Sequence, residues 1–125
     1  MIAIGVHHIS FAVRDLERAS AFYEGLLGLE RIPRPDLGIP GLWYRAGAAE
    51  VHLIETPAGL DLGRPPEKLS PLANHQAFRI ESYAAARDLF RARGLELLET
   101  SPERGQLWIR DPDGNVIELI AAPGD

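Results

Sequence analysis

The sequence contains no cysteine, a single methionine and no apolar run of 18 residues. Without thiols the chain can form neither a disulfide nor a thiolate metal site, so any metal must take nitrogen or oxygen ligands. The lack of a long apolar run excludes a transmembrane helix, and residues 1–6 are too short for the apolar region of a signal peptide. We therefore expect a cytoplasmic protein that does not contact membranes.

Positive charge is also scarce, because 13 Lys and Arg face 18 Asp and Glu and leave a formal net charge of -5. This balance argues against nucleic acid as the main partner. The 125 residues, of which 46% are hydrophobic, fit one domain spanning 1–125. A chain of this length buries roughly two-thirds of its unfolded surface, which is enough for a sizeable core.

Hydrophobic periodicity and capping residues predict an alternation of strands and helices. Asp15 and Ser82 suit helix N-caps, and Gly28 and Gly94 suit the positions where those helices end. The stretch 31–41 holds three prolines and is expected to be a loop or an edge strand. We expect helices at 16–27 and 83–93, and strands at 4–13, 42–46, 50–55, 74–80, 95–98, 106–110 and 116–120.

The second half of the chain repeats the first. Residues 42–45 (LWYR) match 107–110 (LWIR) at an offset of 65, and 51–54 (VHLI) match 117–120 (IELI) at an offset of 66. The order of helices and strands is the same in both halves. We therefore predict two modules, 1–56 and 74–125, joined by the proline-rich linker 57–73.

The repeat aligns four residues that can bind a metal. His8 and His75 occupy matching positions in the first strand of each module, and His52 and Glu118 occupy matching positions in the last. Glu118 interrupts an apolar strand, where a buried carboxylate is costly unless a cation receives it. Neighbouring strands lie about 4.8 Å apart, so such side chains can converge on one ion. Three imidazoles and a carboxylate suit one divalent transition metal, namely Zn, Ni, Co, Mn or Fe(II).

Four segments resemble the vicinal oxygen chelate superfamily: 8–16 (HISFAVRDL), 22–23 (FY), 27–29 (LGL) and 111–119 (DPDGNVIEL). This superfamily includes glyoxalase I, extradiol dioxygenases, methylmalonyl-CoA epimerase, fosfomycin-resistance enzymes and metal-free bleomycin-binding proteins. The resemblance implies an α+β fold in which two βαβββ modules form an incomplete eight-stranded barrel around a metal. In short chains it further implies that two subunits complete each other's barrels, hence a homodimer.

The family's metal positions fall on His8, His52, His75 and Glu118, although glyoxalase I typically has Glu at the place of His52. Bacterial glyoxalase I also holds glutathione with an Arg four residues after its first ligand. This chain has Ala12 there, which argues against a glutathione adduct as the substrate.

The aromatic and cationic side chains of the strands indicate what kind of substrate the protein binds. If the apolar residues of these strands face the helices, the alternate positions face the barrel interior or its mouth. Aromatic and cationic groups there favour a small, anionic, oxygen-rich molecule. The alternative is that the arginines pair with nearby acidic residues. The substrate-binding candidates are Trp43, Arg45, Arg79, Trp108 and Arg110.

The favoured function is a glyoxalase I-like lyase or isomerase that removes a proton next to a carbonyl of a metal-chelating substrate. Glu118 is then both a ligand and the catalytic base. One alternative is an Fe(II) extradiol-type dioxygenase with His8, His75 and Glu118 as ligands, but His52 would fill a position that such a centre leaves open. The other is a metal-free protein that binds a drug or metabolite.

Overall fold

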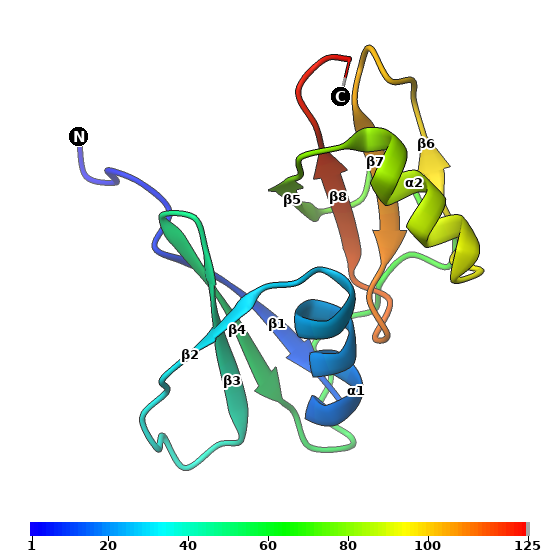
Figure 1. The fold of residues 1–125 in the computed structure, drawn as a ribbon. Helices are drawn as coiled ribbons and strands as arrows, with labels where there is room; N and C mark the ends of the chain where they lie inside the picture. The colour runs from blue at the N-terminus through cyan, green and yellow to red at the C-terminus, as the bar shows by residue number, and fades with distance from the viewer. Residues whose placement is uncertain (125) are drawn as a thin grey trace. The chain divides into compact units, whose positions relative to one another are not determined.

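A computed structural model describes residues 1–124, and the chain divides into two compact units, Met1–Gly63 and Arg64–Asp125. Each unit contains one four-stranded sheet with helical structure against one face (Figure 1). The boundary between Gly63 and Arg64 lies inside the segment expected to be a linker, 57–73, and residues 56–74 contain no helix or strand. No helix among the described residues is long and apolar enough to cross a membrane.

The first unit is built from β1 (His8–Val13), α1 (Leu16–Ser20), η1 (Ala21–Leu26), β2 (Glu30–Ile32), β3 (Gly41–Ala46) and β4 (Ala49–Glu55). Its sheet has the order β1-β4-β3-β2. The first and last strands, β1 and β4, are parallel neighbours, whereas β4–β3 and β3–β2 are antiparallel.

The second unit is built from β5 (His75–Arg79), α2 (Tyr83–Ala92), β6 (Leu98–Glu99), β7 (Gln106–Arg110) and β8 (Val116–Ile120). Its sheet has the order β5-β8-β7-β6, again with the first and last strands parallel. The register repeats too, since Trp43 lies opposite His52 and Trp108 lies opposite Glu118. The predicted α+β fold of two βαβββ modules is confirmed, and each sheet is open in the described chain.

Alternation along the strands separates a core face from a polar face. On β4, Val51 and Leu53 are wholly buried against the helix side, and His52 between them points to the other face. On β8, Ile117 and Leu119 flank Glu118 in the same way. The core of each unit therefore lies between sheet and helix, and the opposite face carries the candidate ligands.

The capping predictions are confirmed, because the side chain of Asp15 accepts from the N–H of Arg18 and that of Ser82 accepts from the N–H of Ala85. The first helix, however, widens after Ser20 into a π-helical turn. There the N–H of Leu27 donates to the carbonyl of Phe22, five residues back, at 2.9 Å.

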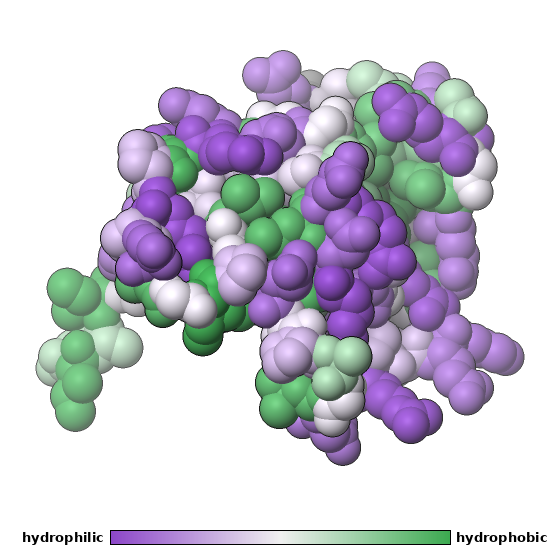
Figure 2. All heavy atoms as spheres, turned by 90° about the horizontal axis from the view of Figure 1, so that it is seen from below, coloured by the Kyte–Doolittle hydropathy of each residue, from purple (hydrophilic) through white to green (hydrophobic). Residues whose placement is uncertain are grey.

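The first strand begins at His8, so the prediction that it starts at Ile4 was wrong. Its partner β4 begins only at Ala49, and the pairing starts with His8 opposite Glu50. The carbonyl of His7 still accepts the N–H of Glu50 in β4 at 3.0 Å, but Ile2 and Ile4 further back are 103% and 91% exposed. This N-terminal segment protrudes as a hydrophobic projection (Figure 2).

The segment after residue 63 covers part of the polar face of the second sheet. Leu69 packs against Trp108 and Val116, and all three are buried. The guanidinium of Arg110 donates to the carbonyl of Pro66 at 2.9 Å and to that of Glu67 at 2.7 Å. These two bonds fix the course of the segment over β7 and β8.

Candidate functional site

In the first unit the polar face carries a stack of three rings. His52 is parallel to Trp43, with ring centroids 4.3 Å apart and an interplanar angle of 7°. On its other face His52 lies 4.0 Å from His8 at an angle of 15°. His52 is 8% exposed, whereas His8 is on the surface. The two imidazoles are adjacent because β1 and β4 pair side by side, as the repeat predicted.

Two further groups set the electrostatics of this stack. Glu50 Oε1 lies 2.9 Å from His52 Nε2, and this hydrogen bond lowers the pKa of Glu50. His7 Nδ1 lies 2.8 Å from His8 Nδ1. Desolvation, and then the proximity of His52 and His7, lower the pKa of His8. A lowered pKa keeps the His8 imidazole neutral, which is the form that can bind a metal.

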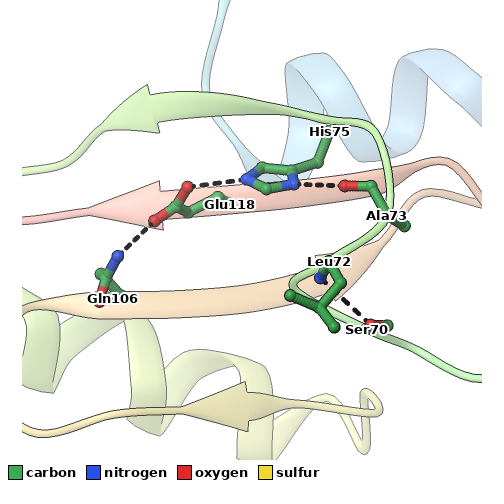
Figure 3. A network of polar contacts seen from close by, with 6 residues as sticks. All are labelled: Ser70, Leu72, Ala73, His75, Gln106 and Glu118. Atoms are coloured by element: carbon green, nitrogen blue, oxygen red, sulfur yellow. Dashed lines mark hydrogen bonds and ion pairs between the residues drawn. The ribbon is translucent and has the colours of Figure 1, made fainter.

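In the second unit the corresponding face carries a chain of hydrogen bonds through Glu118 (Figure 3). Gln106 Nε2 donates to Glu118 Oε1 at 3.0 Å. Glu118 Oε2 lies 3.0 Å from His75 Nε2, and His75 Nδ1 lies 2.7 Å from the carbonyl oxygen of Ala73. Glu118 is 8% exposed, so both of its oxygens are satisfied in a nearly buried setting.

The tautomer of His75 follows from the bond to Ala73. A carbonyl can only accept, so Nδ1 carries the proton and donates it. In a neutral ring Nε2 then carries a lone pair, and this lone pair would face Glu118 Oε2, 3.0 Å from Nε2. Two acceptors at that distance need a cation between or on them. Either a proton is shared between His75 and Glu118, or a metal ion takes both groups as ligands.

The four predicted ligands thus occur as two pairs, His8 with His52 in the first unit and His75 with Glu118 in the second. No group of three or more His, Asp or Glu side chains suited to a metal occurs among residues 1–124. The donor set itself fits a divalent transition metal, because imidazole nitrogens and a carboxylate oxygen are its usual ligands. The Ala73 carbonyl also fits, since a ligating His normally donates its second nitrogen to such an acceptor.

The predicted substrate-binding residues differ in their surroundings. Trp43 is half-buried and stacks on His52, whereas Trp108 is buried beneath the segment that Leu69 belongs to. Arg110 is occupied by backbone carbonyls and by an ion pair to Glu96 at 3.4 Å.

Arg45 and Arg79 are both exposed. Neither makes a hydrogen bond or an ion pair with another part of the described chain. The charge of Arg45 acts on Glu50, its cross-strand neighbour, whereas Arg79 remains available to a ligand.

Sequence reasoning missed two residues that contact the predicted ligands, Glu50 and Gln106. Both could have been found from strand register. Glu50 lies two positions before His52 on the same face of β4. Gln106 pairs with Ile120, two positions after Glu118, which places its side chain diagonally across from the carboxylate.

Residues 5–119 match the family model described as the Glyoxalase/Bleomycin resistance protein/Dioxygenase superfamily. The chain is 29% identical over 126 residues to the protein Glyoxylase I 4 of Arabidopsis thaliana, covering 91% of this chain and 68% of that protein. It is 36% identical over 59 residues to human mitochondrial methylmalonyl-CoA epimerase, covering 45% of this chain and 33% of the epimerase.

Among solved structures, a protein assigned to the glyoxalase family from Bacillus anthracis superposes with a TM-score of 0.77. The two chains are 24% identical, and the alignment covers 98% of each. At this identity the likeness is one of fold. The family model, in contrast, spans nearly the whole sequence and both pairs of predicted ligands. The chain belongs to the Glyoxalase/Bleomycin resistance protein/Dioxygenase superfamily.

Proposed function

We propose that this protein is a divalent-metal-dependent enzyme that removes a proton next to a carbonyl group of a small, oxygen-rich substrate. The observation that carries the proposal is the contact between His75 Nε2 and Glu118 Oε2 at 3.0 Å, with His75 Nδ1 committed to Ala73. Such an arrangement presents two electron-pair donors to one cation. The similarity to methylmalonyl-CoA epimerase supports the reaction class, because inversion beside a carbonyl requires removal of a proton there.

His8, His52, His75 and Glu118 would hold the ion, which would be Zn, Ni, Co, Mn or Fe(II). A bound divalent cation would supply Lewis acidity towards the substrate's oxygen atoms.

The chain's own groups handle the proton. Glu118 Oε2 would accept it once that oxygen no longer ligates the ion, while Gln106 holds the other carboxylate oxygen through its amide N–H. The limited exposure of Glu118 supports a role as base, because few waters compete for its oxygens. Trp43, stacked on His52, offers a flat apolar surface against which a small substrate can lie.

Metal binding is the decisive test. Protein prepared without a histidine tag, stripped with chelator and reloaded, is expected to bind one divalent ion per site by elemental analysis and calorimetry. His8→Ala, His52→Ala and His75→Ala should each weaken binding by about tenfold or more, since each removes a ligand. Glu103→Gln, an exposed carboxylate outside the four ligands, is the control and should bind as the parent does. A parent protein that takes up none of the five metals would refute the proposal.

The base is tested separately with Glu118→Gln, for which Glu103→Gln on the surface is the control. We expect the first variant to lose exchange of the α-proton of methylmalonyl-CoA with deuterated solvent by about a hundredfold or more. The control should exchange at the parent rate. Full exchange activity in Glu118→Gln, with metal bound, would remove Glu118 from this role.

We further propose that the working form is a homodimer, because each sheet has open edges in the described chain. Light scattering is expected to give twice the chain mass. If ligands come from two chains, mixing His8→Ala with His75→Ala should restore metal binding in part of the dimers. If they come from one chain, mixing should restore none.

A second candidate is a metal-free binding protein, and one observation favours it. The chain Gln106–Glu118–His75–Ala73 is complete when His75 is an imidazolium, so the buried carboxylate needs no metal. This reading predicts ligand affinity that chelator leaves unchanged. Oxygen consumption with a catechol after anaerobic iron loading would instead favour the dioxygenase alternative.

A further inference from the structure

Arg34 is a partly buried cation without a partner. It lies in the proline-rich loop between β2 and β3, and its Nε is buried with no hydrogen-bond acceptor. The guanidinium makes no hydrogen bond or ion pair with any of residues 1–124. A guanidinium has five N–H donors, and leaving a buried donor unsatisfied is costly. An anion that accepts hydrogen bonds from this guanidinium would therefore be bound favourably.

The guanidinium is brought to the ligand-bearing face of the sheet by a glycine. A Cβ on Gly41 would lie 2.8 Å from both Cζ and Nη2 of Arg34, so the side chain occupies the space that the glycine leaves. Gly41 and Trp43 are alternate residues of β3 and share a face, and Trp43 pairs with His52. Arg34 therefore sits about 7 Å along the strand from the Trp43–His52 stack.

A cavity of about 410 Å³ adjoins this guanidinium and is open to solvent over most of its extent. Leu16, Ile39 and Pro40 give it an apolar wall. Asp36 also lines it, but Asp36 Oδ1 accepts the N–H of Gly38 at 2.9 Å, and no ion pair joins Asp36 to Arg34. The cavity thus combines one free cation with a short aliphatic surface.

We propose that Arg34 and this cavity form a carboxylate-binding subsite, which takes a small organic acid through a bidentate contact to the guanidinium. A carboxylate matches the planar fork of Arg with two parallel N–H···O bonds. The aliphatic part of the acid would lie against Leu16 and Pro40. Binding of the acid stands by itself, whereas its use as an anchor for the substrate's acidic group rests on the proposed function.

The subsite is tested on metal-free protein in the presence of chelator, with malonate as the probe and neutral malonamide as its control. Titration with malonate is expected to shift the Arg34 Nε–Hε resonance and the amide resonances of residues 36–39 and 41 in a ¹H–¹⁵N spectrum. Malonamide should shift neither. Because no metal is present, a negative result here leaves the metal proposal standing, and failure of metal binding leaves this test unaffected.

Three variants assign the effect to this cation. Arg34→Gln should weaken malonate binding at least tenfold, since it removes a charge-assisted bidentate contact. Arg34→Lys keeps the positive charge but loses the planar pair of N–H donors, so its malonate affinity should lie between those of the parent and Arg34→Gln. This variant also provides the test if Arg34→Gln does not fold. Asp36→Asn should tighten binding by removing a like charge from the cavity.

Arg64→Gln, an exposed arginine in the other unit, is the matched control and should bind as the parent does. Malonate shifts that persist unchanged in Arg34→Gln would overturn the proposal. So would an Arg34 Nε–Hε resonance that malonate does not move in either the parent or Asp36→Asn.

Discussion

Removing the carboxylate of Asp111 should loosen the hairpin that positions Glu118. Asp111 is 4% exposed and lies at the turn between β7 and β8. Its Oδ1 accepts the backbone N–H groups of Asp113 at 2.9 Å and Asn115 at 2.8 Å. Its Oδ2 accepts the side-chain amide of Asn115 at 2.8 Å. Asp111→Ala abolishes all three bonds in a single step.

The size of the loss follows from the charge and the burial. A hydrogen bond to a charged group contributes about 1.5–3 kcal/mol, but the three share one acceptor group and water can reach part of the turn. We therefore expect Asp111→Ala to lower the free energy of unfolding by about 3 kcal/mol, which corresponds to a drop in Tm of roughly 10 °C. Asp111→Asn should cost about 1–2 kcal/mol, because its amide opposes the amide of Asn115 while Oδ1 still accepts.

Urea and thermal unfolding followed by circular dichroism measure these differences. The double variant Asp111→Asn with Asn115→Asp reverses donor and acceptor between the two side chains and should recover most of the loss. If Asp111→Ala changes stability by less than about 0.5 kcal/mol, the turn does not depend on this carboxylate. If the exchanged pair is no better than Asp111→Asn, the bond between the two side chains is not the cause.

Two further predictions concern stability. Burial raises the pKa of Tyr44, and the nearby guanidinium of Arg31 only partly opposes this shift. The neutral phenol therefore stabilises the fold fully below about pH 10, and this contribution is lost as the pH rises through the higher folded value. Tyr44→Phe should lose less stability than the parent between pH 8 and 11 in urea titrations, and equal losses would contradict the assignment. Gly105 has a φ of 71°, and a Cβ there would lie 2.5 Å from the carbonyl oxygen of Ala121. Gly105→Ala should cost about 2 kcal/mol or more in the same assay, whereas Gly5→Ala, which meets nothing within 4 Å, should be neutral.

Local signals in the sequence were sufficient for most of the fold. Asp15 and Ser82 cap their helices because a short acceptor side chain satisfies a free N–H at the first turn. The repeat predicted that the two halves are equivalent, and the structure gives both the same register, with Trp43 opposite His52 and Trp108 opposite Glu118. Strand alternation then placed each candidate ligand on the face away from the helix.

Non-local contacts are what the sequence could not reveal. Residues Ile4 and Val6 have strand-forming side chains, yet β4 starts too late to pair with them. Arg34 sits among prolines that indicate a loop, and nothing local says that its guanidinium fills the space above Gly41. The approach of His75 to Glu118 was predicted, whereas the contact of Gln106 depends on the register of β7 against β8, which turn and strand signals did not supply.

Because the two tryptophans have different surroundings, each can serve as a separate intrinsic fluorescence probe. Trp108 is sealed under Leu69, so its emission should be blue-shifted and should change only when the second unit unfolds. Trp43 is half-buried and stacks on His52, so its emission should respond to a molecule that binds on this face of the sheet. Trp43→Phe would leave Trp108 as the only tryptophan, which reports unfolding of the second unit. Trp108→Phe would leave Trp43, which reports binding of a molecule on the first sheet.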